Sequence, residues 1–360
     1  MAIFVDAAAG PLFKAAAPAA AIGRQAVRRR AGAMLGGLAL FNAATWIWAV
    51  IAFHDAPVML GAALVVYGLG LRHAVDADHI AAIDNVTRKL MQSGQRPVGV
   101  GLFFALGHST IVIAVTALVA SLAIGIGGFR QLQAIGGLIA SGVSASFLIA
   151  VAVMNILIFI PIYRNYRRVR AGEPYREEDL DVLLNNRGLL SRTLRPLFGL
   201  VSRSWHMFGL GFVFGLGFDT ATEVAMFGVS AAHAAKGASA ASVMVFPVLF
   251  AAGMSLVDTA DGVLMLGAYD WAFVKPIRKL HYNMAITLLS ICTAIAIGGI
   301  EALAILQDQL HAESRLWSVV KALGANLNMA GFAIVGVFVA SWAASFAIYR
   351  IKNSTPNCDA

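Results

Sequence analysis

The sequence contains little charge. Asp, Glu, Lys and Arg make up 13% of its 360 residues, while 59% of the residues are hydrophobic. A soluble domain carries roughly 25% charged residues. A chain this poor in charge cannot cover its surface with side chains that water solvates, which excludes a soluble globular protein. Inside a bilayer, long apolar runs satisfy their backbone hydrogen bonds as helices. The expected fold class is therefore an all-α polytopic membrane protein.

The sequence has few cysteines, and it has neither a phosphate-binding loop nor the pattern of a cleavable signal peptide. The 2 cysteines, Cys292 in an apolar run and Cys358 in the tail, exclude a disulfide framework and a thiolate metal site. No phosphate-binding loop of the form GxxxxGK(S/T) occurs, so nothing indicates ATP hydrolysis. We expect no cleavable signal peptide, because the arginines at 24–30 follow the Ala-rich stretch instead of preceding it.

Long apolar runs are abundant, and a membrane-spanning helix needs about 20 such residues. Eight runs qualify: 32–53, 58–84, 98–124, 132–162, 206–231, 241–268, 284–306 and 317–349. If the Arg24 end is cytoplasmic, 22 of the 27 Lys and Arg lie on the cytoplasmic side and 4 on the other. This asymmetry predicts eight transmembrane helices with both termini cytoplasmic. The net charge of +8 is then explained by basic residues that fix the orientation in the membrane and contact anionic lipid headgroups, so we expect no nucleic-acid partner.

The expected organisation has five parts. A cytoplasmic N-terminal segment (1–31) is followed by spans 1–4 (32–163), a cytoplasmic Arg-rich loop (164–205), spans 5–8 (206–349) and a cytoplasmic tail (350–360). The loop is short for an independent core, so a solvated loop is favoured over a regulatory domain. A ninth span within residues 2–23 is the alternative at the N-terminus.

Two short strings recur at nearly the same offset. Gly68-Leu69-Gly70 in span 2 matches Gly215-Leu216-Gly217 in span 5, and residues 104–109 in span 3 match residues 250–255 in span 6. Spans 2–4 would then repeat as spans 5–7. Because three is an odd number of spans, the second copy must be inverted in the membrane, which is a common plan among transporters.

Ionisable residues inside a membrane are costly and usually functional. At about 100° per residue on an ideal helix, Arg72, His73, Asp76 and His79 of span 2 share about a third of the circumference. Asp78 points away from that arc. A structural ion pair between Arg72 and Asp76 is the simpler alternative.

Spans 3, 5 and 6 contribute further polar groups, namely His108, Ser109 and Thr110, then Asp219, Thr222 and Glu223, then Asp258 and Asp261. Arg72 is the only basic residue well inside a span, so a divalent cation would supply the positive charge that these carboxylates lack. Imidazole with carboxylate suits Ni, Zn, Fe or Cu better than Mg or Ca. A packing role for His108 and capping roles for Asp219 and Asp258 are the alternatives.

With these residues the chain resembles the nickel/cobalt transporter (NiCoT) family, whose second span carries His, four residues and then Asp-His. Here that motif is His73 followed by Asp78-His79, within RHAVDADHIAAIDN; the family strings LGHST, LGFDTATE and GMSLVDTADG follow in order. The resemblance covers about residues 32–350. It implies an eight-span permease that takes up Ni²⁺ or Co²⁺ across the bacterial cytoplasmic (inner) membrane, without a resident cofactor or an ATPase subunit. It also implies that His73, Asp78 and His79 are essential for metal recognition.

We expect the metal ligands to come from four spans. They are His73, Asp76, Asp78, His79, His108, Asp219, Glu223, Asp258 and Asp261, supported by Arg72, Ser109, Thr110, Thr222 and Met254. Met254 is more typical of packing than of ligation. Because an ideal helix turns Asp78 away from the histidines, we predict a distorted helix there.

The expected function is a secondary transporter and not an enzyme, with Ni²⁺ as the first substrate and Co²⁺ as the next. One alternative is an intramembrane Zn-dependent hydrolase, which would retain its metal and open a cleft to lipid. Another is a proton-coupled carrier of organic cations that uses His73, Asp76 and His79 as a relay. The pocket of such a carrier should be lined by aromatic side chains.

Overall fold

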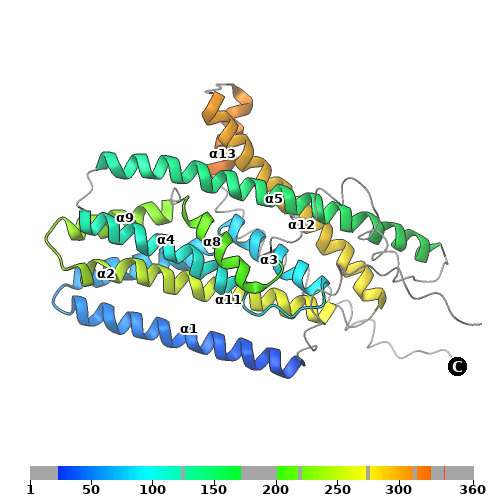
Figure 1. The fold of residues 1–360 in the computed structure, drawn as a ribbon, viewed down its shortest axis with the longest axis horizontal. Helices are drawn as coiled ribbons and strands as arrows, with labels where there is room; N and C mark the ends of the chain where they lie inside the picture. Colours follow the sequence, from blue (N-terminus) through cyan, green and yellow to red (C-terminus); the bar gives the residue numbers. More distant parts are fainter. Residues whose placement is uncertain are drawn as a thin grey trace, which may run out of the picture.

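The computed structural model describes residues 23–122, 126–171, 201–217, 221–272, 276–310, 314–325 and 336, and within these ranges the chain is helical without strands (Figure 1). The helices are α1 (Arg24–Phe53), α2 (Pro57–His73), α3 (Ala77–Gln92), α4 (Val100–Leu122), α5 (Ile126–Arg170), the 3₁₀ turn η1 (Ser204–His206), α8 (Met207–Gly215), α9 (Ala221–Ala234), α10 (Ala240–Val243), α11 (Val245–Ala272), α12 (Pro276–Leu310) and α13 (Arg315–Ala325). The all-α prediction is confirmed for these residues.

Several of these helices are long and apolar enough to cross a membrane. Within the described ranges four qualify, at Gln25–Phe53, Val100–Leu118, Ala240–Gly267 and Thr287–Gln307, and the bent pair of α2 and α3 makes a fifth. The polytopic class is thus supported, while eight spans remain a prediction. The expected eighth span continues past Ala325, and most of the N-terminal segment, of the Arg-rich loop and of the tail also lies outside the described residues.

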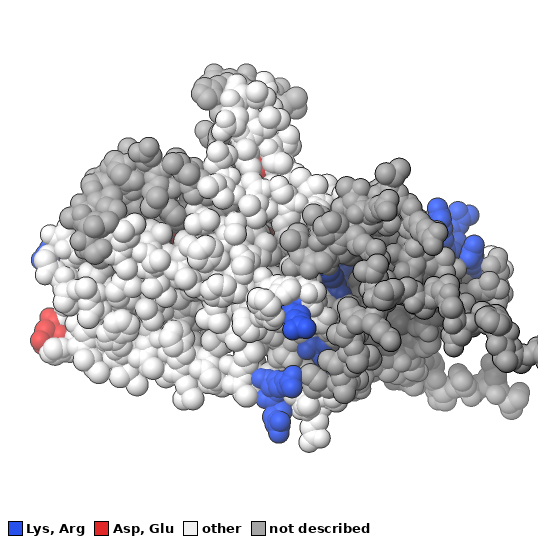
Figure 2. Space-filling model, in the orientation of Figure 1, with Lys and Arg blue, Asp and Glu red and all other residues white. Residues whose placement is uncertain are grey.

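Apolar and charged side chains are separated on the surface. Leu40, Ile47 and Ile51 on α1 are more than half exposed, which suits contact with lipid. Figure 2 shows most of the visible Lys and Arg side chains toward the end where α1 begins and α5 ends, with one further basic group at the opposite edge. Arg28–Arg30 of α1 and Arg167 and Arg168 of α5 are exposed there. The orientation of this end toward the cytoplasm stays a prediction from the sequence.

The centre of the bundle holds α2, α4, α8 and α11 in direct backbone contact. A Cβ built on Gly70 of α2 would collide with the carbonyl oxygen of Phe250 on α11. A Cβ on Gly107 of α4 would likewise collide with the backbone of Phe208 on α8. Small residues let membrane helices approach this closely and gain van der Waals contact. We call these two glycine-lined interfaces, α2 with α11 and α4 with α8, the seams.

The second span is broken in the middle of the molecule. α2 ends at His73, α3 begins at Ala77, and the two helices meet at an angle of 48°. Asp76, just before α3, has an extended backbone (φ −65°, ψ 146°). The distortion predicted beside Asp78 is confirmed, since Asp78 lies in the first turn of the new helix, where a carboxylate favours the helix dipole. The ideal-helix projection from His73 therefore does not extend to His79.

The fifth predicted span consists of two helices in the same way. α8 ends at Gly215 and is followed by a turn at Leu216-Gly217, and α9 begins at Ala221. In Figure 1, α2 and α8 approach the centre of the molecule from opposite ends. Both second halves, α3 and α9, therefore begin near the middle of the bundle, where helix termini and polar side chains meet.

Candidate metal-binding site

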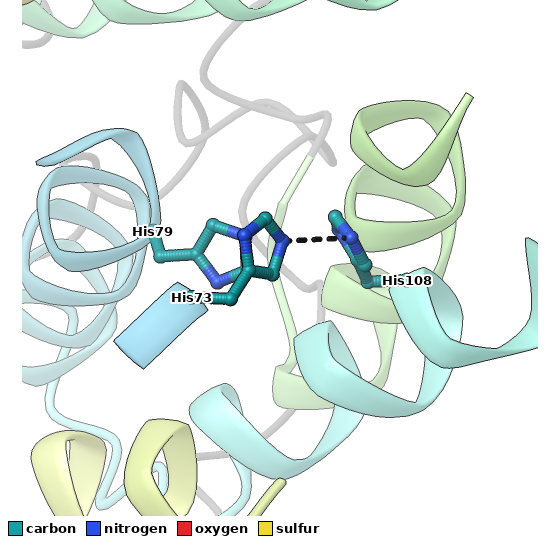
Figure 3. Close-up of side chains that lie close together, drawn as sticks. All are labelled: His73, His79 and His108. Carbon is teal, nitrogen blue, oxygen red and sulfur yellow. Dashed lines mark hydrogen bonds between the residues drawn. The ribbon is translucent and has the colours of Figure 1, made fainter. Parts of the chain in front are cut away.

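Three histidines from two spans meet at the break between α2 and α3 (Figure 3). His73 is the last residue of α2, His79 lies in the first turn of α3, and His108 comes from the middle of α4. One ring nitrogen of each lies within 4.8 Å of the others, and each side chain is at most 3% exposed. Among the described residues, these three histidines form a group whose ring nitrogens lie close enough together to hold one metal ion.

The spacing of the nitrogens suits ligands of one ion. Nε2 of His73 and Nε2 of His108 lie 3.1 Å apart. Two nitrogens that each bind an ion at about 2.1 Å, the imidazole–zinc distance, lie about 3.0 Å apart when they subtend a right angle. The same separation fits an N–H···N hydrogen bond, in which one ring must donate. Geometry alone therefore permits both a bound cation and a shared proton.

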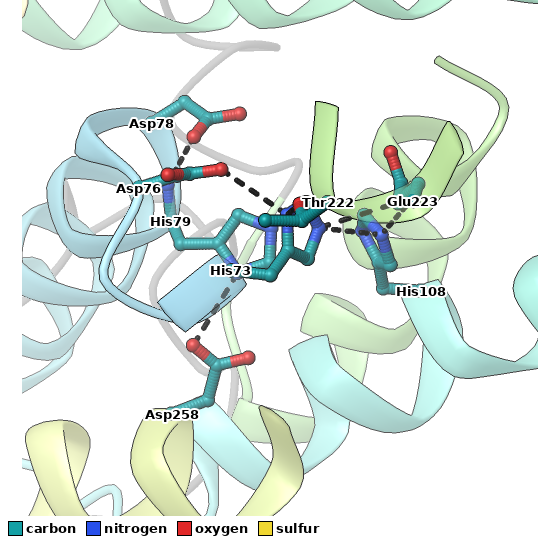
Figure 4. A network of polar contacts seen from close by, with 8 residues as sticks. All are labelled: His73, Asp76, Asp78, His79, His108, Thr222, Glu223 and Asp258. Atoms are coloured by element: carbon teal, nitrogen blue, oxygen red, sulfur yellow. Dashed lines mark hydrogen bonds and ion pairs between the residues drawn. The ribbon is translucent and has the colours of Figure 1, made fainter. Parts of the chain in front are cut away.

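The position of Glu223 favours a bound cation over a proton shared between His73 and His108. Its Oε1 lies 2.9 Å from Nε2 of His108 and 3.9 Å from Nε2 of His73 (Figure 4). A neutral imidazole has one N–H, so the single proton on Nε2 of His108 cannot serve both Glu223 and His73. Glu223 is 1% exposed. Two nitrogens and a carboxylate oxygen thus lie close together deep inside the protein, and this combination of ligands suits a divalent transition-metal ion.

The second ring nitrogen of two histidines is held by neighbouring oxygens. Nδ1 of His73 lies 3.1 Å from Asp76 Oδ2 and 3.2 Å from the hydroxyl of Thr222. Nδ1 of His79 lies 3.3 Å from Asp258 Oδ1. A carboxylate on Nδ1 fixes the ring orientation and leaves Nε2 for a metal. Nδ1 of His108 is buried and has no hydrogen-bond partner in the part of the chain that the structure describes.

Two aromatic rings border the cluster. Phe104 of α4 lies edge-on to His79, with ring centroids 4.8 Å apart, and Phe250 of α11 lies 5.3 Å from the ring of His73. Both phenylalanines are fully buried. They keep the imidazoles in place and exclude water from one side of the cluster. Sequence reasoning missed these residues, although both begin the strings matched between spans 3 and 6.

The structure separates the predicted residues into those near the cluster and those elsewhere. His73, Asp76, His79, His108, Thr222, Glu223 and Asp258 come together (Figure 4). Asp78 accepts a hydrogen bond from the backbone N–H of His79, at 2.9 Å. Asp261 lies one helical turn beyond Asp258. Asp219 lies outside the described residues.

The supporting residues are also divided. Ser109 is buried beside His108, and its hydroxyl has no partner among the described residues. Thr110 is exposed and donates to the carbonyl of Leu106. Arg72, at the end of α2, is exposed as well. Met254 is fully buried in the apolar core with Phe246 and Phe250, in agreement with its expected packing role.

Comparison with known proteins adds an independent line of evidence. Residues 59–348 match the model of the family described as high-affinity nickel-transport protein. The chain is 51% identical to a high-affinity nickel transport protein of Cupriavidus necator, over 88% of this chain and 90% of that protein. It is 43% identical to the high-affinity nickel-transport protein NixA of Helicobacter pylori (81% and 89%) and 36% identical to the cobalt transport protein NhlF of Rhodococcus rhodochrous (90% and 94%). No solved structure matches the chain. The protein belongs to the family of high-affinity nickel-transport proteins, a family of membrane transporters and not of enzymes.

Proposed function

We propose that the chain is a secondary transporter that takes up Ni²⁺, and Co²⁺ next, across the bacterial cytoplasmic membrane through the histidine cluster. The observation that carries the proposal is the convergence of His73 Nε2, His108 Nε2 and Glu223 Oε1 within 3.9 Å of one another. Relatives with this family's sequence are named as nickel and cobalt transporters. The metal is the transported substrate, and the family carries no resident cofactor.

The ion would bind where two interrupted spans meet. His73 and His79 flank the break between α2 and α3, while Thr222 and Glu223 lie in the first turn of α9. Interrupted helices near the bilayer midplane expose helix ends and freed backbone groups, and transporters use them to bind ions. The absence of a thiolate suits transport, because a cysteine cage would hold the ion too tightly to release it.

Reciprocal contacts in the seams support an inverted repeat of spans 2–4 and 5–7. Gly70 of α2 meets the carbonyl of Phe250, and Gly253 of α11 meets the carbonyl of Tyr67. In the other seam, Gly211 of α8 meets the carbonyl of Phe104, and Gly107 of α4 meets that of Phe208. In both seams the carbonyl of a matched phenylalanine, Phe104 or Phe250, faces a glycine of the partner helix, as the predicted repeat requires. They pair Gly70 with Gly211, so the Gly-Leu-Gly string at 209–211 fits the repeat better than the one at 215–217.

Transport would proceed by alternating access to the central site. The matching seams give two related halves, and rocking of one half against the other would open the site to each side in turn. The chain has no phosphate-binding loop, so the membrane potential, a proton gradient or trapping of the metal inside the cell would drive uptake. With the basic end facing the cytoplasm, α3 and α11 lead from the site toward the inside of the cell.

Family membership gives no support to the alternative of an intramembrane zinc hydrolase. A hydrolase would need a resident ion with an open position for water. The two functions differ in one readout, because a hydrolase retains stoichiometric zinc through purification and moves no metal across the membrane.

The proposal is tested by uptake of radioactive nickel into cells that express the wild type, His73→Ala or His54→Ala. We expect saturable uptake by the wild type and at least a 100-fold loss in His73→Ala, because a direct ligand should cost more than the 10–100-fold known for outer-shell partners. His54→Ala is the matched control, since His54 is exposed at the end of α1. Cobalt and zinc serve as competitors to rank the metals.

Membrane abundance of each variant is measured in parallel by immunoblot. Uptake untouched by His73→Ala at equal abundance would mean that the cluster is not the transport site. No uptake by the wild type, together with zinc retained after purification, would favour the hydrolase.

A further inference from the structure

The two halves of the fifth span are held in the bundle by different means. In α8, a Cβ built on Gly211 or on Gly215 would collide with the carbonyl oxygen of Phe104 or of His108 on α4. In α9 the one glycine is Gly228, and a Cβ there would meet nothing within 4 Å. Close backbone contact therefore fixes α8 to α4, because glycines let the two helices touch. No glycine seam holds α9, which depends on its side chains.

One face of α9 is buried and the other is exposed. The exposed side chains belong to residues that would face lipid: Val224, Ala225, Gly228 and Ala232. The buried ones recur at the spacing of a single helix face: Thr222, Glu223, Met226, Phe227 and Ser230. α9 is thus a helix at the edge of the bundle, and its outer side packs against no other described helix. Such a helix can move outward without breaking packing on two sides.

The first turn of α9 reaches the histidine cluster. Glu223 Oε1 lies 2.9 Å from His108 Nε2, and the hydroxyl of Thr222 lies 3.2 Å from His73 Nδ1 (Figure 4). The two histidines belong to α2 and α4, which the seams hold. Movement of α9 would therefore carry Glu223 and Thr222 away and leave both imidazoles in place. An incoming ion would meet the histidines first and the carboxylate last.

The last turn of α9 is fastened to three other helices through His233. Its Nε2 lies 3.2 Å from the hydroxyl of Ser242 on α10. That hydroxyl donates its own proton to the carbonyl of Ser239 at 2.8 Å, so His233 must be the donor. The imidazole also lies edge-on to Phe53 of α1 and Phe246 of α11, with ring centroids 5.5 and 5.7 Å away. We call the contacts of His233 with Ser242, Phe53 and Phe246 the latch.

The latch lies at the end of the molecule opposite the basic end. Phe53 is the last residue of α1, whereas the exposed arginines of α1 lie near its start. Figure 1 shows α9 toward the end of the molecule where α1 ends. With the basic end facing the cytoplasm, the latch is at the outer surface, and α9 leads from there to the histidine cluster.

We propose that α9 is the outer gate of the transport path. It moves away from α2 and α4 to admit the ion, and it closes through the latch, with Glu223 as the last ligand to reach the metal. The gate rests on the proposed function and names the part of the moving half that opens outward. A bound ion favours closure, because it attracts the Glu223 carboxylate toward the imidazoles and so binds the closed state better than the open one.

The first test ties α9 to α10 at the latch. His233→Cys and Ser242→Cys are combined in a chain whose Cys292 and Cys358 are replaced by alanine. A bifunctional methanethiosulfonate with a short spacer joins the thiols, because a cysteine side chain is shorter than the imidazole and a direct disulfide would not reach. We expect linking to lower the rate of radioactive nickel uptake about 10-fold or more, and a reductant to restore it. Mass spectrometry gives the linked fraction.

A second pair is the matched control for the linker. Ser239→Cys with Ser242→Cys lies within the first turn of α10, where the two hydroxyls are 3.2 Å apart. This link does not reach α9, so it should change nickel uptake less than about 2-fold relative to the same variant before linking. Undiminished uptake by fully linked His233→Cys/Ser242→Cys would overturn the gate. If His73→Ala still abolished uptake in that case, the proposed function would stand without it.

A further measurement does not depend on uptake, and it decides the matter if the linked pair is inactive from the outset. Ser230 is 1% exposed on the buried face of α9. In the chain without native cysteines, a membrane-impermeant thiol reagent added outside the cells should label Ser230→Cys about 5-fold faster once His233→Ala removes the latch, and added nickel should slow the labelling. Ser239→Cys, exposed at the outer end, is the control and should react equally in both backgrounds. Equal labelling of Ser230→Cys with and without His233→Ala would overturn the latch and the gate.

Discussion

The seams and the helix breaks lie side by side in the core but use opposite kinds of residue. In α4, Gly107 touches the backbone of α8, and the next residue, His108, points its ring at the other histidines. In α2, Gly70 touches α11, and three residues later His73 ends the helix. At the seams, glycines let the backbones of two helices touch. At the breaks, the helix is interrupted and polar side chains meet.

The difference explains how a membrane protein can hold ligands within tenths of an ångström. Ligand geometry tolerates little displacement, so the residues that position a site must themselves be rigid. Lipid offers no hydrophobic driving force between helices, and close backbone packing takes its place. The seams supply this rigidity, and the breaks supply the polar groups. Three predictions test this division, from the largest expected effect to the smallest.

Gly107→Ala should disrupt a seam and with it the fold. The added methyl group collides with the backbone of Phe208, which no side-chain rotation relieves, so we expect a loss of about 3 kcal/mol, the upper end of typical overpacking costs. The measurement is the melting temperature in detergent. Gly68→Ala is the control, because its Cβ would meet nothing within 4 Å. Equal melting temperatures for the two variants would refute the role of the seam.

Asp76→Asn should impair the site and leave the fold intact. The carboxylate that holds Nδ1 of His73 becomes an amide, which weakens the ring as a ligand and lowers nickel affinity by about 10- to 100-fold. Concentration-dependent nickel uptake gives the apparent KM, and the melting temperature should stay near that of the wild type. A variant with normal KM and a lowered melting temperature would assign Asp76 to folding instead.

Thr222→Val should have the smallest effect. The hydroxyl of Thr222 is the second partner of His73 Nδ1, at 3.2 Å, and Asp76 remains after its removal. Loss of one such hydrogen bond is worth about 1 kcal/mol, so nickel affinity should fall about 5-fold. The double variant with Asp76→Asn should lose more than the two single effects combined if both groups hold the same nitrogen. Additive losses in nickel uptake would show that they act separately.

The sequence indicated which spans carry the site, because buried charge is rare enough in lipid to be visible as a pattern. His73, His79, His108, Glu223 and Asp258 were all recognised in this way, and the structure brings them together. Asp261 was predicted as a ligand of the same site, and this stays a prediction.

The predicted repeat shows a similar limit. The sequence pattern matched Gly-Leu-Gly at 68–70 to the string at 215–217, although the same three residues also occur at 209–211. Contacts across the seams favour the string at 209–211. If the proposed repeat holds, it relates the scaffold and not the ligands, because the position matched to His108 is Met254, a core residue.

The sequence by itself indicated that lipid surrounds the chain, that the fold is helical, where Lys and Arg gather, and which apolar runs carry imidazole and carboxylate groups. Each of these features depends on composition or on spacing within one helix. The tertiary structure alone decided where α2 breaks, which glycines touch, how far apart the Nε2 atoms lie and which carboxylates contact the histidines. Those features depend on contacts between helices far apart in the chain, and no periodicity within a helix encodes the distance from its neighbour.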